Sequence, residues 1–213
     1  MSDEGLIRIE AGGVRLEGNL IVPKSAKGIV LFAHGSGSSR FSSRNRQVAE
    51  SLRTRGLATL LIDLLSRDEE LVDTRTAHLR FDIELLAGRL VGSAEWLAKE
   101  HGELKIGLFG ASTGGAAALV AAARMPDRIR AVVSRGGRPD LAADALPNVK
   151  APTLLIVGGD DGPVIGMNQD AYNKMTTLRR IEIVPGASHL FEEPGALEEV
   201  ARLAADWFVQ YLA

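Results

Sequence analysis

The stretch Gly110-Ala111-Ser112-Thr113-Gly114 decides the fold, because a strand-like segment precedes it and a helix-like segment follows it. The preceding residues, Leu104–Phe109, are short and mostly apolar, as in a buried strand. The following residues, 115–124, are rich in alanine and have high helix propensity. A serine between a strand and a helix, with glycine two residues away on each side, is typical of a nucleophile elbow. We therefore expect the Ser112 hydroxyl to project from a sharp turn beside a helix N-terminus.

Strands and helices alternate on both sides of this turn. Near the N-terminus, Leu6–Ala11 and Val14–Val22 flank Gly12-Gly13 and predict an antiparallel hairpin whose turn needs positive φ. The later strands are predicted at Gly28–Ala33, Leu57–Asp63, Leu104–Phe109, Ile129–Ser134, Thr153–Gly158 and Arg180–Val184. The helices are predicted at Arg44–Arg55, Thr76–Glu100, Ala116–Arg124, Ile165–Thr177 and Gly195–Leu212. This alternation predicts one α/β domain over residues 1–213, with a doubly wound, mostly parallel sheet after the hairpin.

Two further residues at predicted strand ends complete a set for nucleophilic catalysis. A serine needs a neighbouring base, and the base needs an acid that orients it. His189 follows the last predicted strand, and Asp161 follows the strand Thr153–Gly158. Ligands bind beyond the carboxyl ends of strands in such sheets, and the chain order Ser, Asp, His is that of α/β hydrolases. We predict a triad of Ser112, Asp161 and His189, with neighbouring Asp160 as the competing acid.

An oxyanion hole requires two backbone N–H groups that point at the developing negative charge. The N–H of Thr113, directly after the nucleophile, is one candidate. The loop after Gly28–Ala33 supplies the other, for which Ser36 is favoured and Gly37 is the alternative. His34 in the same loop is interpreted as a structural brace rather than a base.

Four motifs carry a resemblance to a known family, in order along nearly the whole chain. They are HGSGSS (34–39), GASTGG (110–115), LLIVGGDDGPV (154–164) and PGASHLFEEPG (185–195). The chain resembles the dienelactone hydrolase family, and most of all its esterase-like members that use serine. Dienelactone hydrolases proper use a cysteine nucleophile, whereas this chain has Ser112 and no cysteine. The resemblance implies an α/β-hydrolase fold and acyl transfer, but it does not carry the dienelactone substrate over to this chain.

Charged residues near the predicted site suggest how a substrate is held. Arg40, Arg44 and Arg46 follow the oxyanion loop, and Arg135 follows another strand. Either they are solvated, or they form a cationic wall for a carboxylate-bearing ester, because guanidinium groups match carboxylates bidentately. We take Gly37, Arg44 and Arg135 as candidate substrate-binding residues. The acidic run 68–70 (Asp-Glu-Glu) is interpreted as a solvated loop that could pair with these arginines.

Another feature of the site is the short connection after Ile129–Ser134. Only residues 136–150 separate this strand from the next one, which leaves room for a turn and one short helix. We therefore expect no cap domain and an open, shallow site that suits small esters.

Composition limits the remaining possibilities. The chain has 213 residues, 25 Lys and Arg against 27 Asp and Glu, and no cysteine. The near-neutral charge argues against a nucleic-acid partner, and the lack of cysteine excludes disulfides and thiolate metal sites. No apolar run reaches the roughly 20 residues that span a bilayer, and residues 1–5 lack the apolar segment of a secretion signal. We expect a cytoplasmic protein with a small-molecule ester substrate, no cofactor, no metal and no membrane partner.

The predicted function is hydrolysis of small carboxylic esters or lactones through an acyl-enzyme intermediate. The same triad could instead serve acyl transfer, amide cleavage or perhydrolysis. A different class of function is a non-catalytic, hydrolase-like binding module. The presence of serine, aspartate and histidine at three matching strand ends weighs against that alternative.

Overall fold

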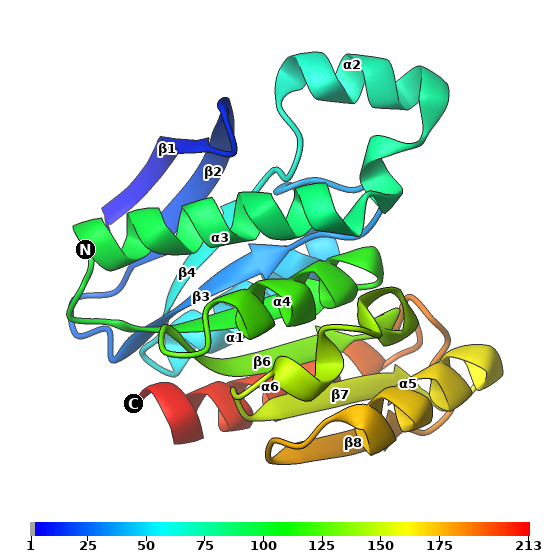
Figure 1. Cartoon of the computed structure of the whole chain (residues 1–213). Coiled ribbons are helices and arrows are strands. Elements are labelled where there is room, and N and C mark those ends of the chain that lie inside the picture. Colours follow the sequence, from blue (N-terminus) through cyan, green and yellow to red (C-terminus); the bar gives the residue numbers. More distant parts are fainter. Residues whose placement is uncertain (1–2) are drawn as a thin grey trace.

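The computed structural model describes residues 3–213 and contains a sheet of eight strands in the order β1-β2-β4-β3-β5-β6-β7-β8 (Figure 1). β1 and β2 pair antiparallel, β2 pairs antiparallel with β4, and all later neighbours pair parallel. The doubly wound, mostly parallel sheet with an N-terminal hairpin is therefore confirmed. The strands are β1 (Asp3–Ala11), β2 (Val14–Val22), β3 (Gly28–Ala33), β4 (Ala58–Ile62), β5 (Lys105–Ala111), β6 (Ile129–Arg135), β7 (Thr153–Gly158) and β8 (Arg179–Val184).

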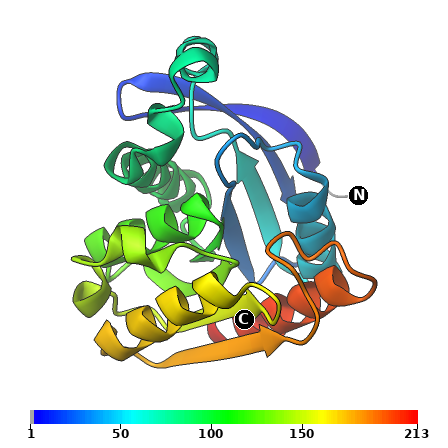
Figure 2. The ribbon, with the colours of Figure 1, turned by 90° about the vertical axis from the view of Figure 1, so that its right-hand side faces the viewer.

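Helices cover both faces of this sheet (Figure 2). α1 (Ser43–Thr54) and α6 (Ala196–Leu212) pack together on one face. α3 (Ile83–Glu100), α4 (Thr113–Arg124) and α5 (Gly162–Lys174) lie on the other face. Each face has its own apolar core, and strands β3 and β7 are buried along their whole length. Burial on both faces explains why these two strands are continuous apolar runs in the sequence.

The hairpin turn and the central helix have the conformations that their residues predict. Gly12 and Gly13 both have positive φ, 57° and 79°, which a glycine pair adopts without steric penalty. Residues 113–122 of α4 are all buried, and most of them are glycine or alanine. Such small side chains allow α4 to approach the sheet closely and bring its N-terminus against the end of β5.

The predicted helix Thr76–Glu100 is wrong at its start. The chain forms α2 (Arg67–Thr76), then a left-handed residue, Ala77, then the 3-10 helix η1 (Leu79–Phe81). α3 begins only after Asp82, whose carboxylate caps the helix by accepting from the N–H of Leu85. Leu79 continues the apolar periodicity of α3 in sequence but lies outside that helix.

The acidic run 68–70 is not a loop, as predicted, but the first turn of α2. Ser66 and Glu69 form a reciprocal capping box, with each side chain accepting from the other residue's backbone N–H. The Glu69 carboxylate also pairs with the buried Arg89 at 2.5 Å, and not with the arginines near the oxyanion loop. The capping box and the Glu69–Arg89 pair therefore fix the start of α2, and the helix projects from the body of the protein (Figure 1).

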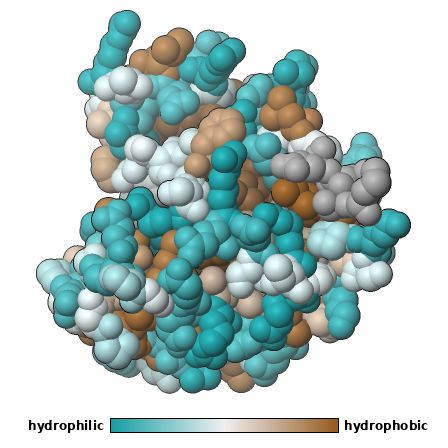
Figure 3. All heavy atoms as spheres, turned by 180° about the vertical axis from the view of Figure 1, so that it is seen from behind, coloured by the Kyte–Doolittle hydropathy of each residue, from teal (hydrophilic) through white to brown (hydrophobic). Residues whose placement is uncertain are grey.

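The connection between β6 and β7 has no inserted domain, as the few residues between the two strands predict. Residues 136–152 contain only two 3-10 helices, η2 (Pro139–Ala142) and η3 (Leu146–Asn148), and no cap domain. The ends of β5, β6 and β7 are therefore left uncovered by any inserted domain. Hydrophilic side chains cover most of the face seen in Figure 3. Among residues 3–213, no helix combines the length and the apolar character needed to cross a bilayer.

Candidate active site

Ser112 occupies a strained turn between β5 and α4. Its backbone angles are φ 51° and ψ −121°, a conformation that a non-glycine residue rarely adopts. The glycines on either side are required by close backbone contacts. A Cβ on Gly110 would overlap the backbone of residues 114–115, and one on Gly114 would overlap the carbonyl oxygens of residues 33 and 34. The turn thus has the geometry of a nucleophile elbow.

The three predicted triad residues meet above this turn. His189 Nδ1 lies 2.6 Å from Asp161 Oδ2, and His189 Nε2 lies 3.4 Å from Ser112 Oγ. The Asp161 side chain is 13% exposed and that of His189 is 37% exposed. A carboxylate beside Nδ1 favours the tautomer with its proton on that nitrogen, which leaves the lone pair of Nε2 facing the serine. The 3.4 Å separation is long for a hydrogen bond, as is common for catalytic pairs without bound substrate.

The two neighbouring aspartates have different surroundings. Asp161 is the N-cap residue of α5, and its carboxylate faces His189. Asp160 is exposed, and its backbone N–H donates to the carbonyl of Ala187. The geometry therefore favours Asp161 as the residue that orients the histidine.

The loop that carries His189 is anchored at several points. Phe191 has φ 57° and is buried beneath the loop. The backbone N–H of Ser188 donates to the Glu193 carboxylate at 3.0 Å. Hydrogen bonds from Ser188 lower the pKa of the Glu193 carboxyl below its ordinary value. These contacts hold the imidazole over the elbow without help from another domain.

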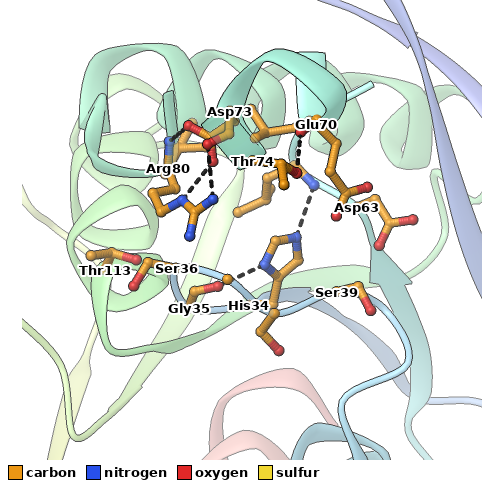
Figure 4. Close-up of a pocket in the computed structure, with 15 residues that line it drawn as sticks. His34, Gly35, Ser36, Ser39, Asp63, Glu70, Asp73, Thr74, Arg80 and Thr113 are labelled. Atoms are coloured by element: carbon orange, nitrogen blue, oxygen red, sulfur yellow. Dashed lines mark hydrogen bonds and ion pairs between the residues drawn. The ribbon is translucent and has the colours of Figure 1, made fainter. Parts of the chain in front are cut away.

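The loop after β3 faces the elbow from the opposite side. Ser36, Gly37 and Thr113 all line one cavity of about 210 Å³ (Figure 4). Gly37 has φ 68°, which explains why glycine stands there. The candidate donors of the oxyanion hole, the N–H groups of Ser36 and Thr113, thus belong to residues that lie together at the edge of this cavity.

His34 braces this loop. Its Nε2 accepts from the backbone N–H of Leu64 at 3.1 Å, so its Nδ1–H donates to the Gly35 carbonyl at 2.9 Å. Burial lowers the pKa of His34 and outweighs the raising effects of the Gly35 carbonyl and the Asp63 carboxylate. A neutral histidine with both nitrogens engaged ties the loops after β3 and β4 together, in agreement with its interpretation as a brace.

Comparisons with known proteins identify the family of the chain. Residues 16–212 match the model of the dienelactone hydrolase family. The chain belongs to the dienelactone hydrolase family. A dienelactone hydrolase from Anabaena variabilis is 63% identical, with a TM-score of 0.98 over 100% of this chain and 99% of that one. The fold is that of the α/β hydrolases.

More distant and longer relatives add detail. Est1E from Butyrivibrio proteoclasticus has a TM-score of 0.82 at 17% identity and covers 97% of this chain and 98% of its own, so it shares the fold. A protein of Mycobacterium tuberculosis, provisionally named a phosphoribosyl transferase, is 56% identical over 208 residues, or 97% of this chain. The match covers 46% of that protein, so this dienelactone hydrolase-family chain spans about half the length of the curated relatives it matches.

Two of the arginines considered for a cationic wall, Arg40 and Arg46, contact other side chains of the protein. The Arg40 guanidinium is already engaged by Asp63, by Glu17 at 2.9 Å and by Asn19 at 3.0 Å. Arg46 is exposed, and its guanidinium stacks over the ring of Phe41. The ion pairs of Arg40 leave its guanidinium unavailable to a substrate, whereas the exposed Arg46 agrees with the solvated alternative.

Arg44 and Arg135, in contrast, lie beside the histidine loop. Arg135 is 6% exposed, its guanidinium lies 5.9 Å from the centroid of the Phe191 ring, and its carbonyl accepts from the N–H of Ser112. Within residues 3–213, Nε and Nη1 of Arg135 and Nε of Arg44 are buried without a hydrogen-bond partner. Burial and the charge of Arg44 lower the pKa of Arg135 to about 10. Arg44 makes one ion pair, to Glu192 at 2.8 Å.

The wall of the 210 Å³ cavity that faces the loop after β3 was not predicted from the sequence. Glu70, Asp73 and Thr74 of α2 and Arg80 of η1 line it together with Ser36 (Figure 4). The capping box at Ser66 was the available signal for α2. Within the part of the chain that the structure describes, no three His, Asp or Glu side chains gather in a way that could hold a metal ion.

Proposed function

We propose that this dienelactone hydrolase-family chain cleaves small carboxylic esters or lactones through an acyl-enzyme intermediate on Ser112. The observation that carries this proposal is the alignment of Ser112, His189 and Asp161 above a strained elbow. Strain at Ser112 holds its Oγ clear of the sheet in one orientation, so little reorganisation is needed for attack.

The reaction can be derived from the roles that these groups can perform. Ser112 Oγ attacks the acyl carbon while His189 Nε2 takes its proton, and the Asp161 carboxylate stabilises the imidazolium. The N–H groups of Thr113 and Ser36 donate to the tetrahedral oxyanion, with Gly37 shaping the same loop. His189 then protonates the departing alcohol oxygen. A water molecule, deprotonated by His189, attacks the acyl-enzyme and releases the acid.

The alternative reactions differ from ester hydrolysis in the bond that is cleaved or in the nucleophile that accepts the acyl group. Acyl transfer, amide cleavage and perhydrolysis use the same groups, and competing nucleophiles added to an assay would separate them. A non-catalytic binding module would have no need for an imidazole between a carboxylate and a strained serine. The provisional name of the mycobacterial relatives belongs to proteins about twice as long, and the elbow geometry instead supports acyl chemistry for this chain.

Labelling with a fluorophosphonate probe tests the nucleophile. Attack by Ser112 Oγ on phosphorus expels fluoride and leaves a stable adduct, and only an activated serine reacts readily. We expect one adduct per chain, located on the peptide that contains Ser112. Failure to label a protein that hydrolyses esters would contradict the mechanism.

Arg135 and Arg44 support a finer proposal about the substrate. A buried guanidinium without a counter-ion is energetically unfavourable, so a bound anion would relieve both its desolvation and its repulsion by Arg44. Arg135 ends β6, which lies on the side of β5 where β7 and β8 carry Asp161 and His189. The alcohol oxygen must leave next to His189. We therefore place an anionic group, such as a carboxylate, on the alcohol part of the ester.

Replacing Arg135 with methionine tests this placement. Loss of charge-assisted hydrogen bonds, each worth about 1.5–3 kcal/mol, should lower kcat/KM for esters with an anionic alcohol part by roughly tenfold or more relative to neutral esters. The free energy of unfolding should not fall, because an unpaired buried charge is removed. Arg46→Met, which removes an exposed charge from the same helix as Arg44, should leave the ratio unchanged. Equal ratios in the Arg135→Met variant and the native protein would reject the anion site.

A further inference from the structure

The cavity beside the oxyanion loop is a defined binding site. It lies between residues 34–39 on one side and α2 with η1 on the other, and its volume is about 210 Å³ (Figure 4). Leu64, Leu65 and Leu86 supply its apolar lining, and Ser36 and Thr113 connect it to the elbow. A space of this size accommodates a short chain rather than a long lipid tail.

The order of the strands indicates which part of an ester enters this cavity. Its lining comes from the loops after β3 and β4, which lie on one side of β5. Asp161 and His189 follow β7 and β8, on the other side of β5. Because the alcohol oxygen must leave beside His189, the alcohol part extends away from this cavity. The acyl part therefore extends into it.

The wall formed by α2 and η1 presents a fixed hydrogen-bond donor. Arg80 donates to Asp73 through Nε at 2.6 Å and through Nη2 to the Asp73 carbonyl at 3.0 Å. Its Nη1 has no hydrogen-bond partner among residues 3–213 and lies close to Gly37. Burial raises the pKa of Asp73, but hydrogen bonds from Arg80 and from the N–H of Leu79 outweigh this effect and hold the pKa below its ordinary value. Asp73 is thus charged and neutralises Arg80.

The same wall also presents an acceptor, the carboxylate of Glu70 on α2. The Glu70 carboxylate has no hydrogen-bond or ion-pair partner within the described chain, whereas the Asp63 carboxylate is paired with Arg40. His34 is neutral, as its hydrogen bonds indicate. Asp73 and Asp63 each pair with a guanidinium, although Arg40 is shared with Glu17, whereas the exposed Glu70 carboxylate makes no ion pair with another described residue. Ser38 on one side of the cavity and Thr74 on the other add hydroxyl groups to its lining.

We infer that this cavity is the acyl-binding site and that it selects a short, uncharged acyl group bearing a hydroxyl. A hydroxyl on the acyl group can donate to the Glu70 carboxylate, and an oxygen of the acyl group can accept from Nη1 of Arg80, because both residues line the cavity. An anionic acyl group is repelled by Glu70, and a purely apolar one makes no hydrogen bond to either polar group. The inference rests on the proposed ester hydrolysis at Ser112, because it concerns the acyl group that this serine would receive.

The test compares three acyl groups on one common alcohol: butanoyl, 3-hydroxybutanoyl and the anionic succinyl group. The native protein should have its highest kcat/KM for 3-hydroxybutanoyl and its lowest for succinyl. Glu70→Gln should lower the preference for 3-hydroxybutanoyl over butanoyl by roughly tenfold, as expected for loss of a hydrogen bond to a charged group, and should reduce discrimination against succinyl. Asp68→Asn, on the same helix turn but outside the cavity lining, should leave both ratios unchanged.

A pair of matched substitutions tests the position of the acyl group. Thr74 and Thr76 both lie on α2 and both donate to the carbonyl four residues earlier, but only Thr74 lines the cavity. Thr74→Phe should lower the ratio of 3-hydroxybutanoyl to acetyl turnover at least fivefold, whereas Thr76→Phe should not change it. A series of acetyl esters with different alcohols should show no such dependence on Thr74→Phe.

The outcomes separate this inference from the proposed function. Active protein with unchanged acyl ratios in Glu70→Gln and Thr74→Phe would overturn the acyl site and leave the triad intact. An effect of Thr74→Phe on the alcohol series alone would assign the cavity to the alcohol part and also overturn the inference. A variant without Ser112 should lose turnover of every ester, whatever its acyl group. That result tests the triad and not the cavity.

Discussion

The Ser112→Ala variant is expected to lose hydrolysis of short-chain esters by roughly 10⁴- to 10⁶-fold in kcat. The alanine keeps the backbone of the elbow but has no oxygen to attack the acyl carbon. Steady-state hydrolysis of acetyl and butanoyl esters measures the effect. Because the residual rate comes from the oxyanion donors alone, a second substitution at His189 should lower kcat little further.

A neighbouring serine provides the control for this variant. The Ser134 hydroxyl is buried on β6 near Gly115 of the elbow helix and has no hydrogen-bond partner among the described residues. Ser134→Ala should keep kcat within about twofold, since it removes a nearby hydroxyl that faces no catalytic group. Undiminished hydrolysis by Ser112→Ala, in protein whose circular dichroism matches the native protein, would exclude Ser112 as the nucleophile.

The second large effect is expected at the acid. Asp161→Asn should reduce kcat by roughly 10³- to 10⁴-fold, because an amide no longer favours the proton on His189 Nδ1 and no longer stabilises the imidazolium. Asp160→Asn should change kcat by less than about threefold, because the Asp160 side chain is exposed and does not contact the imidazole. Parallel kinetics of the two variants with one ester provide the measurement. The reverse ranking would assign the acid role to Asp160.

Much of the sheet could be predicted because a strand that is buried on both faces is a continuous apolar run in the sequence. Gly28–Ala33 and Thr153–Gly158 match β3 and β7 residue for residue, since both strands are buried on both faces and end at glycine or polar residues. Predicted bounds at β4 and β8 differ by one residue at one or both ends. There, hydrogen bonding to a neighbouring strand determines the end, and composition does not record it.

α2 could not be predicted from periodicity, because it has almost no buried face. Asp73 is its one buried residue, and Leu71 and Val72 are exposed. The apolar spacing that does exist continues from α3 through Leu79, so the two segments read as one helix. The interruption depends on local hydrogen bonds of Asp82 and on the left-handed Ala77. Only the capping box at Ser66 marks α2 in sequence.

The candidate site, like the fold, contains residues that could be predicted from the sequence and residues that could not. Motifs at strand ends predict the meeting of Ser112, Asp161 and His189, because parallel strands bring their carboxyl ends to one edge. The arginines cannot be assigned from sequence, since Arg40 and Arg135 differ only in whether a carboxylate from another element reaches them. The acyl cavity depends on α2 and was missed with it.

Activation of one serine by His189 and Asp161 is the claim on which the proposed chemistry depends. The most direct measurement is mass spectrometry of the native protein after fluorophosphonate treatment, with the Asp161→Asn and Ser112→Ala variants alongside. We predict one adduct per chain on Ser112, slower labelling in Asp161→Asn and no adduct in Ser112→Ala. An adduct on a different serine, or equal labelling of the Ser112→Ala variant, would contradict this claim.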